Sequence, residues 1–297
     1  MAVERVEKGV LFITGACLAS AVFGMLVKLS SSSLAIPLLI LTRFVIPFII
    51  CLPIFYVAGT FKKIGGTRHL ISHWLRALFV VLSQYCYFFY LTKSSLLNAT
   101  MLFNTAPIYI PLVSRFVFKD QSVKVFSKSL FVSLLGVVLL MRPDDSLLIT
   151  ASWIGVLSGV FLGVSQSIYG ENVHDDTLDE NLFYMFLFSS CLAFIALAII
   201  FAENLTDGFE LLILQPLRQW GFIILIGLCT ITSQFFRGLA FINVKPYLLA
   251  PLMNLAVFFA FIFDIFVFKN APDYLSIMGS LLIVSGSLMK WHSLRKS

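Results

Sequence analysis

Residues 101–120 read MLFNTAPIYIPLVSRFVFKD, and residues 251–270 read PLMNLAVFFAFIFDIFVFKN. The two segments lie 150 residues apart, both carry asparagine at the fourth position, and both end on FVFK followed by Asp or Asn. Single matches arise by chance, but a shared four-residue motif with other matches in the same register does not. The sequence therefore predicts an internal repeat.

The repeat extends beyond these segments. At the same shift, Ser83-Gln84-Tyr85 matches Ser233-Gln234-Phe235, and Gly136 matches Gly286. At a shift of 146 residues, Gly9-Val10-Leu11 and Gly24 match Gly155-Val156-Leu157 and Gly170. We therefore divide the chain into two related halves, residues 1–145 and 146–297.

The composition predicts an all-α integral membrane protein. Hydrophobic residues make up 59% of the chain and charged residues 12%, whereas soluble domains are roughly 45 to 50% apolar. The charges fall in short clusters between apolar runs of about 20 residues, the length that crosses a bilayer. We expect ten transmembrane helices, at residues 9–28, 34–58, 73–92, 95–115, 124–141, 152–171, 181–202, 218–241, 246–268 and 273–291.

The distribution of basic residues predicts the orientation. An even number of helices places both termini on one side, and Lys and Arg concentrate on the cytoplasmic side. The side of the termini collects Arg5, Lys8, Lys62, Lys63, Arg68, Arg76, Arg115, Lys119, Lys124, Lys128, Arg237, Lys245, Lys290, Arg295 and Lys296. The other side collects Lys28, Lys93, Arg142, Arg218 and Lys269. We expect both termini in the cytoplasm, and this bias explains the net charge of +6 without a nucleic-acid partner.

The segment 171–180 lies on the predicted cytoplasmic side but contains Asp175, Asp176, Asp179 and Glu180 and neither Lys nor Arg. Acidic residues contribute little to the orientation rule. We interpret the segment as a solvated linker between the halves, with a regulatory or cation-binding loop as the alternative.

Each predicted half contains five helices, and this odd number has a mechanical consequence. The second half must enter the membrane with the orientation opposite to that of the first. Such inverted repeats can exchange an outward-open shape for an inward-open one around a central site. The sequence thus predicts two inverted five-helix repeats and a secondary transporter.

The segment from Leu91 to Met141, with Asn104-Thr105-Ala106-Pro107 and its Phe-rich end, resembles the drug/metabolite transporter superfamily, in its ten-helix branch with two EamA-type repeats. The resemblance covers nearly the whole chain, although the family usually carries Glu where Asp120 and Asn270 stand. Arg43-Phe44 and Leu75-Arg76-Ala77 are also similar to family features.

Within the superfamily, these motifs resemble the S-adenosylmethionine transporters of intracellular bacteria. This resemblance implies an exchanger or proton-linked carrier of S-adenosylmethionine or S-adenosylhomocysteine in the bacterial inner membrane. An amino-acid or drug/metabolite exporter is the alternative, because such exporters share much of the pattern.

Polar side chains inside hydrocarbon are costly, so those in the middle of a span are candidates for substrate binding. The repeat pairs Gln84 with Gln234, Asn104 with Asn254, and Ser20 with Gln166. Interhelical hydrogen bonds are the alternative role for the glutamines. For the asparagines, helix kinking by the nearby Pro107 and Pro251 is the alternative.

Three further residues complete the predicted site. Arg43 lies well inside the second span and is suited to a carboxylate or phosphate, with snorkelling to the interface as the alternative. Tyr85 offers a ring and a hydroxyl for a planar or cationic ligand. Asp264 is an acidic residue inside an apolar run and is the candidate for proton coupling, with ordinary solvation as the alternative.

Other classes of function lack their required motifs. The sequence has no HExxH or GxSG-type nucleophile motif, no GxxxxGK phosphate loop and no CxxC spacing among its five cysteines. We therefore expect no enzyme, no catalytic residue, no metal and no cofactor, and a monomer or homodimer. An intramembrane enzyme and a structural membrane component remain the distant alternatives.

Overall fold

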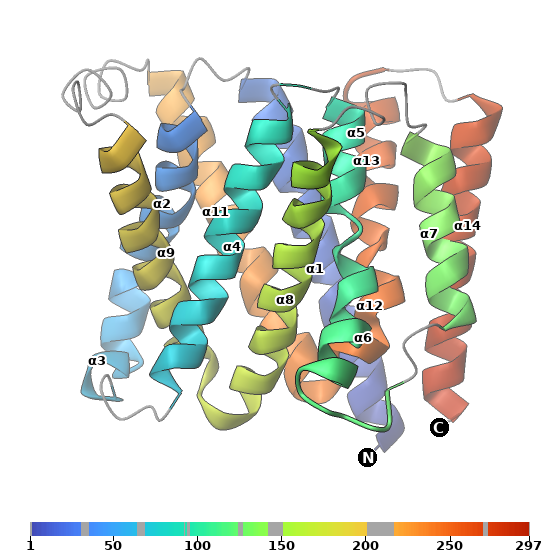
Figure 1. Ribbon diagram of the computed structural model, residues 1–297, viewed down its shortest axis with the longest axis horizontal. Coiled ribbons are helices and arrows are strands. Elements are labelled where there is room, and N and C mark those ends of the chain that lie inside the picture. The colour runs from blue at the N-terminus through green and yellow to red at the C-terminus, as the bar shows by residue number, and fades with distance from the viewer. Residues whose placement is uncertain are drawn as a thin grey trace.

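The computed structural model describes residues 2–30, 36–63, 69–91, 93, 96–123, 127–141, 151–200, 217–269 and 273–296. Regular secondary structure in these residues is helical, and the helices lie side by side in one bundle (Figure 1). Both termini lie at the same end, which we call the terminal end. The helices are α1 Ala2–Ser30, α2 Ile36–Val57, α3 Thr60–Lys63, α4 Leu70–Leu91, α5 Leu96–Phe103, α6 Ala106–Phe116, α7 Lys128–Met141, α8 Ser152–Asp175, α9 Leu178–Ile200, α11 Leu217–Asn243, α12 Pro246–Met253, α13 Leu255–Phe266 and α14 Tyr274–Lys296.

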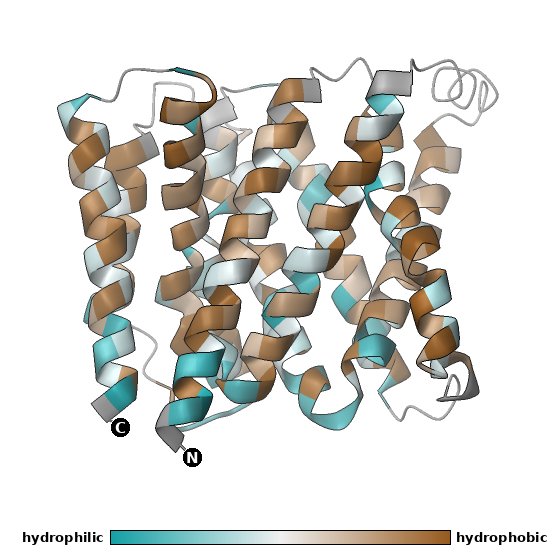
Figure 2. Cartoon of the chain, turned by 180° about the vertical axis from the view of Figure 1, so that it is seen from behind, coloured by the Kyte–Doolittle hydropathy of each residue, from teal (hydrophilic) through white to brown (hydrophobic). Residues whose placement is uncertain are grey.

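The chain is an integral, multi-pass membrane protein. Within the described part, eight helical segments are long and apolar enough to cross a bilayer, with α12 and α13 counted together. Large apolar side chains such as Leu11, Ile49 and Ile195 are exposed on the outside of the bundle. Figure 2 shows hydrophobic residues along the outer helices and hydrophilic residues gathered at the terminal end. This pattern suits a protein whose flanks face lipid.

Each of the ten predicted runs is helical in the described residues, but two of them are broken. The fourth run divides at Asn104-Thr105 into α5 and α6, and the ninth divides at Asn254 into α12 and α13. Pro107 lies in the first turn of α6, where it cannot bond back to the preceding turn. Such breaks free backbone groups, which the membrane interior tolerates only where protein covers them.

The predicted solvated linker at residues 171–180 is wrong in its main feature. Helix α8 continues to Asp175 and α9 begins at Leu178, so the connection is only a short turn. Thr177 and Glu180 form a capping box, in which the Thr177 amide and hydroxyl both donate to Glu180 Oε2 at 2.8 and 2.6 Å. The Glu180 carboxylate therefore caps helix α9, whereas the sequence analysis expected it to be solvated.

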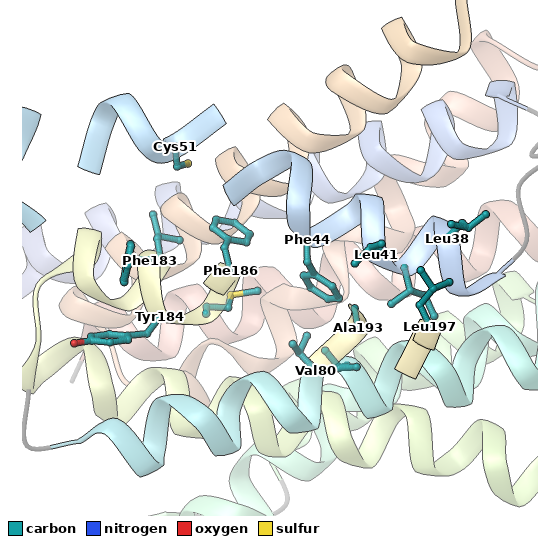
Figure 3. Packing of buried hydrophobic residues seen from close by; sticks show 14 of the residues in the cluster. Leu38, Leu41, Phe44, Cys51, Val80, Phe183, Tyr184, Phe186, Ala193 and Leu197 are labelled. Atoms are coloured by element: carbon teal, nitrogen blue, oxygen red, sulfur yellow. The ribbon is translucent and has the colours of Figure 1, made fainter. Parts of the chain in front are cut away.

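A core of apolar side chains fixes α2 and α9 against α4. Leu38 and Phe44 of α2, Val80 of α4 and Phe186 of α9 belong to one buried cluster (Figure 3). Because lipid is as apolar as these side chains, close packing rather than exclusion from water holds the helices together.

Glycines allow α7 and α14 to touch along their backbones. A Cβ at Gly136 would lie 2.6 Å from Gly279 O and 2.7 Å from Ile283 N, and one at Gly286 would lie 2.7 Å from Ser133 N. Small residues are typical of helix contacts in membranes for this reason.

Gly136→Ala should therefore lower the free energy of unfolding by about 1–3 kcal/mol, because the new methyl group meets backbone atoms that cannot move aside. Thermal unfolding in detergent measures the effect. Gly221→Ala is the matched control, since nothing lies within 4 Å of its added Cβ. An equal effect of the two substitutions would contradict the tight crossing.

An ion pair joins the two halves outside the membrane spans. Lys245 Nζ donates to Asp120 Oδ2 at 2.8 Å, and Ser122 Oγ donates to Asp120 Oδ1 at 2.5 Å. The hydrogen bond from Lys245, followed by those from Ser122, lowers the pKa of Asp120 to about 2. The pKa of an aspartate in an unfolded chain is about 3.9. The pairing therefore stabilises the fold fully above about pH 4, and this contribution is lost as the pH falls toward about 2.

Lys245→Gln should lower the unfolding temperature relative to the wild type, and the difference should shrink between about pH 5 and about pH 2. The reason is that protonation of Asp120 removes the attraction in the wild type as well. Thermal scans at several pH values measure the difference, and a constant difference would show that this pair is not responsible.

Candidate functional site

Arg43 of α2 lies on the ring of Phe23 from α1, with 4.3 Å between the guanidinium carbon and the ring centroid. Its Nη1 donates a short hydrogen bond to Gln84 Oε1 of α4. At about 1.5 Å per residue, Arg43 and Gln84 each lie about 21 Å from the terminal ends of their helices. Arg43 also lies about 10 Å from the other end of α2, so these contacts hold it within the span, and snorkelling to the interface stays the alternative.

Arg76 of α4 forms a second group of the same kind. Its guanidinium carbon lies 3.4 Å from the centroid of the Tyr169 ring of α8, and the residue is 1% exposed. Nη2 donates to Gln234 Oε1 of α11 at 3.5 Å and to Met185 Sδ at 3.0 Å, and Nη1 donates to Asn181 O at 3.2 Å.

The two groups share positions that the predicted repeat makes equivalent. Gln84 and Gln234 correspond at the shift of 150 residues, and Phe23 and Tyr169 correspond at the shift of 146 residues. In each group the guanidinium of an arginine lies over an aromatic ring. The same guanidinium donates a hydrogen bond to a glutamine side-chain oxygen. Arg43 and Arg76 are not themselves equivalent, so the halves build similar surroundings around cations from different helices.

A third arginine lies near both groups. Arg237 of α11 is within electrostatic reach of Arg43 and Arg76. Its Nε is buried and has no hydrogen-bond partner among the described residues. In the same part of the chain, no carboxylate forms an ion pair with any of these three residues, which we call the arginine cluster.

The other predicted site residues have separate surroundings. Ser20 Oγ lies 2.7 Å from Ser233 Oγ, and Asn254 Nδ2 donates to Ser133 Oγ at 2.9 Å. Asn104 Nδ2 donates to Thr100 O of the preceding helix, α5, at 2.8 Å. Asp264 lies in the last turn of α13.

Some of these side chains keep unused hydrogen-bonding capacity. Three predicted site residues each have a buried oxygen without a partner in the described structure: Tyr85 Oη, Gln166 Oε1 and Asn254 Oδ1. Buried polar groups are normally paired, so each unpaired atom is available to a ligand or to water.

Sequence reasoning missed Arg76 and Arg237 as members of the site. Both entered the sequence analysis only as basic residues on the side of the termini, yet each lies six residues inside an apolar helix. At about 1.5 Å per residue this places them about 9 Å from the helix end. The distance of each arginine from the nearest end of its apolar run was the signal that identifies them.

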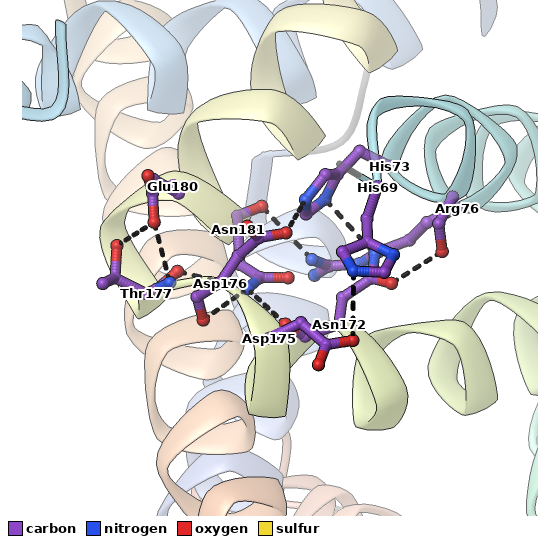
Figure 4. A network of polar contacts seen from close by, with 10 residues as sticks. His69, His73, Arg76, Asn172, Asp175, Asp176, Thr177, Glu180 and Asn181 are labelled. Carbon is purple, nitrogen blue, oxygen red and sulfur yellow. Dashed lines mark hydrogen bonds and ion pairs between the residues drawn. The ribbon is translucent and has the colours of Figure 1, made fainter. Parts of the chain in front are cut away.

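A polar network lies between the arginine cluster and the terminal end (Figure 4). His73 is fully buried, its Nε2 lies 2.8 Å from Asp176 Oδ2, and its Nδ1 lies 3.2 Å from Asn172 Nδ2. Asn181 Nδ2 donates to Asn172 O at 3.2 Å, and its own carbonyl accepts from Arg76. The network therefore connects α4 of the first half with the α8–α9 turn of the second half.

Comparison with known proteins gives consistent matches. The model of the EamA-like transporter family matches residues 7–142. The pseudopaline exporter CntI of Pseudomonas aeruginosa is 25% identical over 96% of both chains. An uncharacterized transporter of Helicobacter pylori is 25% identical over 79% of this chain and 74% of its own. Human solute carrier family 35 member G1 is 24% identical over 71% of this chain and 60% of its own.

A solved crystal structure shares the fold. It superposes with a TM-score of 0.77 over 95% of this chain and 96% of that chain, at 15% sequence identity. The fold and the matches together define a polytopic membrane transporter of small molecules. They confirm the resemblance predicted from the sequence: residues 7–142 match the EamA-like transporter family, and the named relatives are transporters.

Asp176→Ala should lower the free energy of unfolding by about 1–3 kcal/mol, because it leaves the buried His73 ring nitrogen without its partner. Asp175→Ala is the matched control: Asp175 lies 3.4 Å from His69, and both side chains are about half exposed. Such exposed pairs contribute roughly 0–1 kcal/mol. If thermal unfolding in detergent shifts equally for the two variants, the network does not stabilise the terminal end.

Proposed function

We propose that the chain is a secondary transporter that moves a small polar metabolite by alternating access between two inverted five-helix units, residues 1–145 and 146–297. The observation that carries this proposal is the pair of groups around Arg43 and Arg76, in which equivalent glutamines and rings of the two halves surround a cation. A site assembled from both halves can open to either side when the halves tilt.

Matching backbone features support the inverted repeat. Lys119 and Lys269 both adopt positive φ, at 57° and 56°, and the chain breaks at Asn104 and Asn254 in the same register. Ser83 of α4 donates to Ser158 O of α8 at 2.7 Å, and Ser233 of α11 donates to Ala16 O of α1 at 3.2 Å. The equivalent serines thus bond to equivalent helices of the opposite halves.

The mode of transport and the substrate are the finer parts of the proposal. We propose exchange or proton-linked transport, with Asp264 as the coupling residue for the second mode. The pseudopaline exporter matches nearly the full length of the chain, which favours the export of a metabolite. S-adenosylmethionine stays a prediction from the sequence that none of these relatives supports.

Reconstitution into proteoliposomes tests the function. We expect saturable uptake of a radiolabelled solute that is stimulated by the same solute inside, with pseudopaline, S-adenosylmethionine and amino acids as the first solutes. Gln84→Ala and Gln234→Ala should each lower uptake about tenfold, because each removes a hydrogen bond to a charged group.

Gln121→Ala is the matched control for this experiment, because Gln121 is exposed in the turn after α6. Equal protein in the vesicles is verified for every variant. Uptake that is unchanged in both site variants would remove the glutamines from the site, and the absence of saturable uptake for every solute would overturn the proposed function.

A further inference from the structure

The arginine cluster concentrates positive charge inside the bundle. Arginine keeps its proton in proteins, so the three side chains carry three positive charges into the span. Taking an ion from water into a protein interior costs several kcal/mol unless a counter-charge is present, and no carboxylate of the described residues provides one. Among the described residues, the arginine cluster therefore lacks a negatively charged partner.

The contacts that the cluster does make are neutral. Arg76 bonds to a backbone carbonyl, a thioether and an amide oxygen, and Arg43 bonds to an amide oxygen. The rings of Phe23 and Tyr169 add cation–π attraction, which compensates only a part of the cost. Like charges within electrostatic reach add repulsion instead.

The neutral contacts also orient the guanidinium groups. A ring covers one face of each guanidinium, and the N–H donors that the neutral contacts leave unbonded can bind further partners in the guanidinium plane. A planar guanidinium binds carboxylate and phosphate oxygens through two parallel hydrogen bonds. Arg237 has an unpartnered buried Nε, so it retains a donor for the same ligand.

The three arginines lie at two depths in the bundle, with at least one guanidinium toward each end. Arg76 and Arg237 both lie about 9 Å from the terminal end of their helices, and Arg43 lies about 12 Å farther along the bundle axis. A ligand that enters from either side of the membrane therefore meets a guanidinium before it reaches the far side.

We propose that the transported metabolite is an organic oxyanion, whose carboxylate or phosphate group is bound by Arg76 and Arg237 at one level and by Arg43 at the other. Gln84 and Gln234 hold the guanidinium groups in position. This inference rests on the proposed transport function and defines the charge of its substrate.

Thermal unfolding of the purified protein with chosen probes tests the inference. Malate and citrate present carboxylates, 3-phosphoglycerate adds a phosphate, dimethyl malate is the neutral control and arginine methyl ester is the cationic control. We expect the anions to raise the unfolding temperature in a saturable way, because a ligand that binds only the folded state stabilises it. The controls should not, and the ranking of citrate and malate against 3-phosphoglycerate distinguishes carboxylate from phosphate recognition.

Arg76→Gln and Arg237→Gln distinguish a binding role from a structural one. Each should raise the anion concentration needed for half-maximal protection by about tenfold or more, because a charge-assisted hydrogen bond is lost. Without ligand, the unfolding temperature should stay equal or rise, since an unpaired charge has left the interior. Arg76→Lys should recover part of the protection, because it keeps the charge and loses the two-pronged geometry.

Arg295→Gln is the matched control, because this arginine is exposed near the end of α14 and pairs with Glu7 at 3.5 Å. Protection by none of the anions, or equal protection by the neutral or cationic probe, overturns the inference. Variants that unfold at lower temperature without ligand yet keep the anion protection also overturn it. If the vesicles show saturable uptake of a neutral or cationic solute that depends on Gln84 and Gln234, the oxyanion is wrong while the transport function stands.

Discussion

The constraint on which this structure depends is the need of every backbone amide and carbonyl to find a partner where water is absent. Helices satisfy this need by themselves, which explains the all-helical bundle. Where α5 ends and α6 begins, the chain departs from the helix, and α8 covers the break. A Cβ at Gly159 of α8 would collide with Leu102 O and Thr105 Oγ1, so the absence of a side chain lets α8 lie directly against the exposed backbone. The break is tolerated because protein, rather than lipid, surrounds it.

The same bundle contains a second energetic cost, because charged arginines lie at interior positions where apolar residues would pack more favourably. The structure offsets this cost with aromatic rings, amide oxygens and one backbone carbonyl, but it offers no carboxylate from its described residues. Stable folds seldom keep charges in such surroundings without a functional reason. The arrangement therefore separates residues that hold the bundle together from residues that are held ready for a ligand.

Much of the architecture followed from the sequence because it depends on local patterns. Apolar runs marked the helices, the prolines near Asn104 and Asn254 offered kinking as an alternative at the two places where helices break, and Gln84 and Gln234 were found as a pair through the repeat. The surroundings of Arg76 were not predictable in the same way. Its partners Tyr169, Asn181 and Gln234 come from three other helices, and the count of basic residues gave only the side of the membrane on which it lies. Contacts between distant segments depend on packing, which no single run of residues encodes.

The crossing of α7 and α14 has a consequence for how the protein can change shape. An added Cβ at Gly136, Gly279 or Gly286 would lie only 2.6 to 2.7 Å from a backbone atom of the other helix. Sliding one helix along the other would drive a larger neighbouring side chain into a carbonyl, whereas rotation about the point of contact keeps the small residues together. For the proposed alternating access, the tight crossing therefore favours rotation of α7 and α14 about their contact over sliding of one along the other.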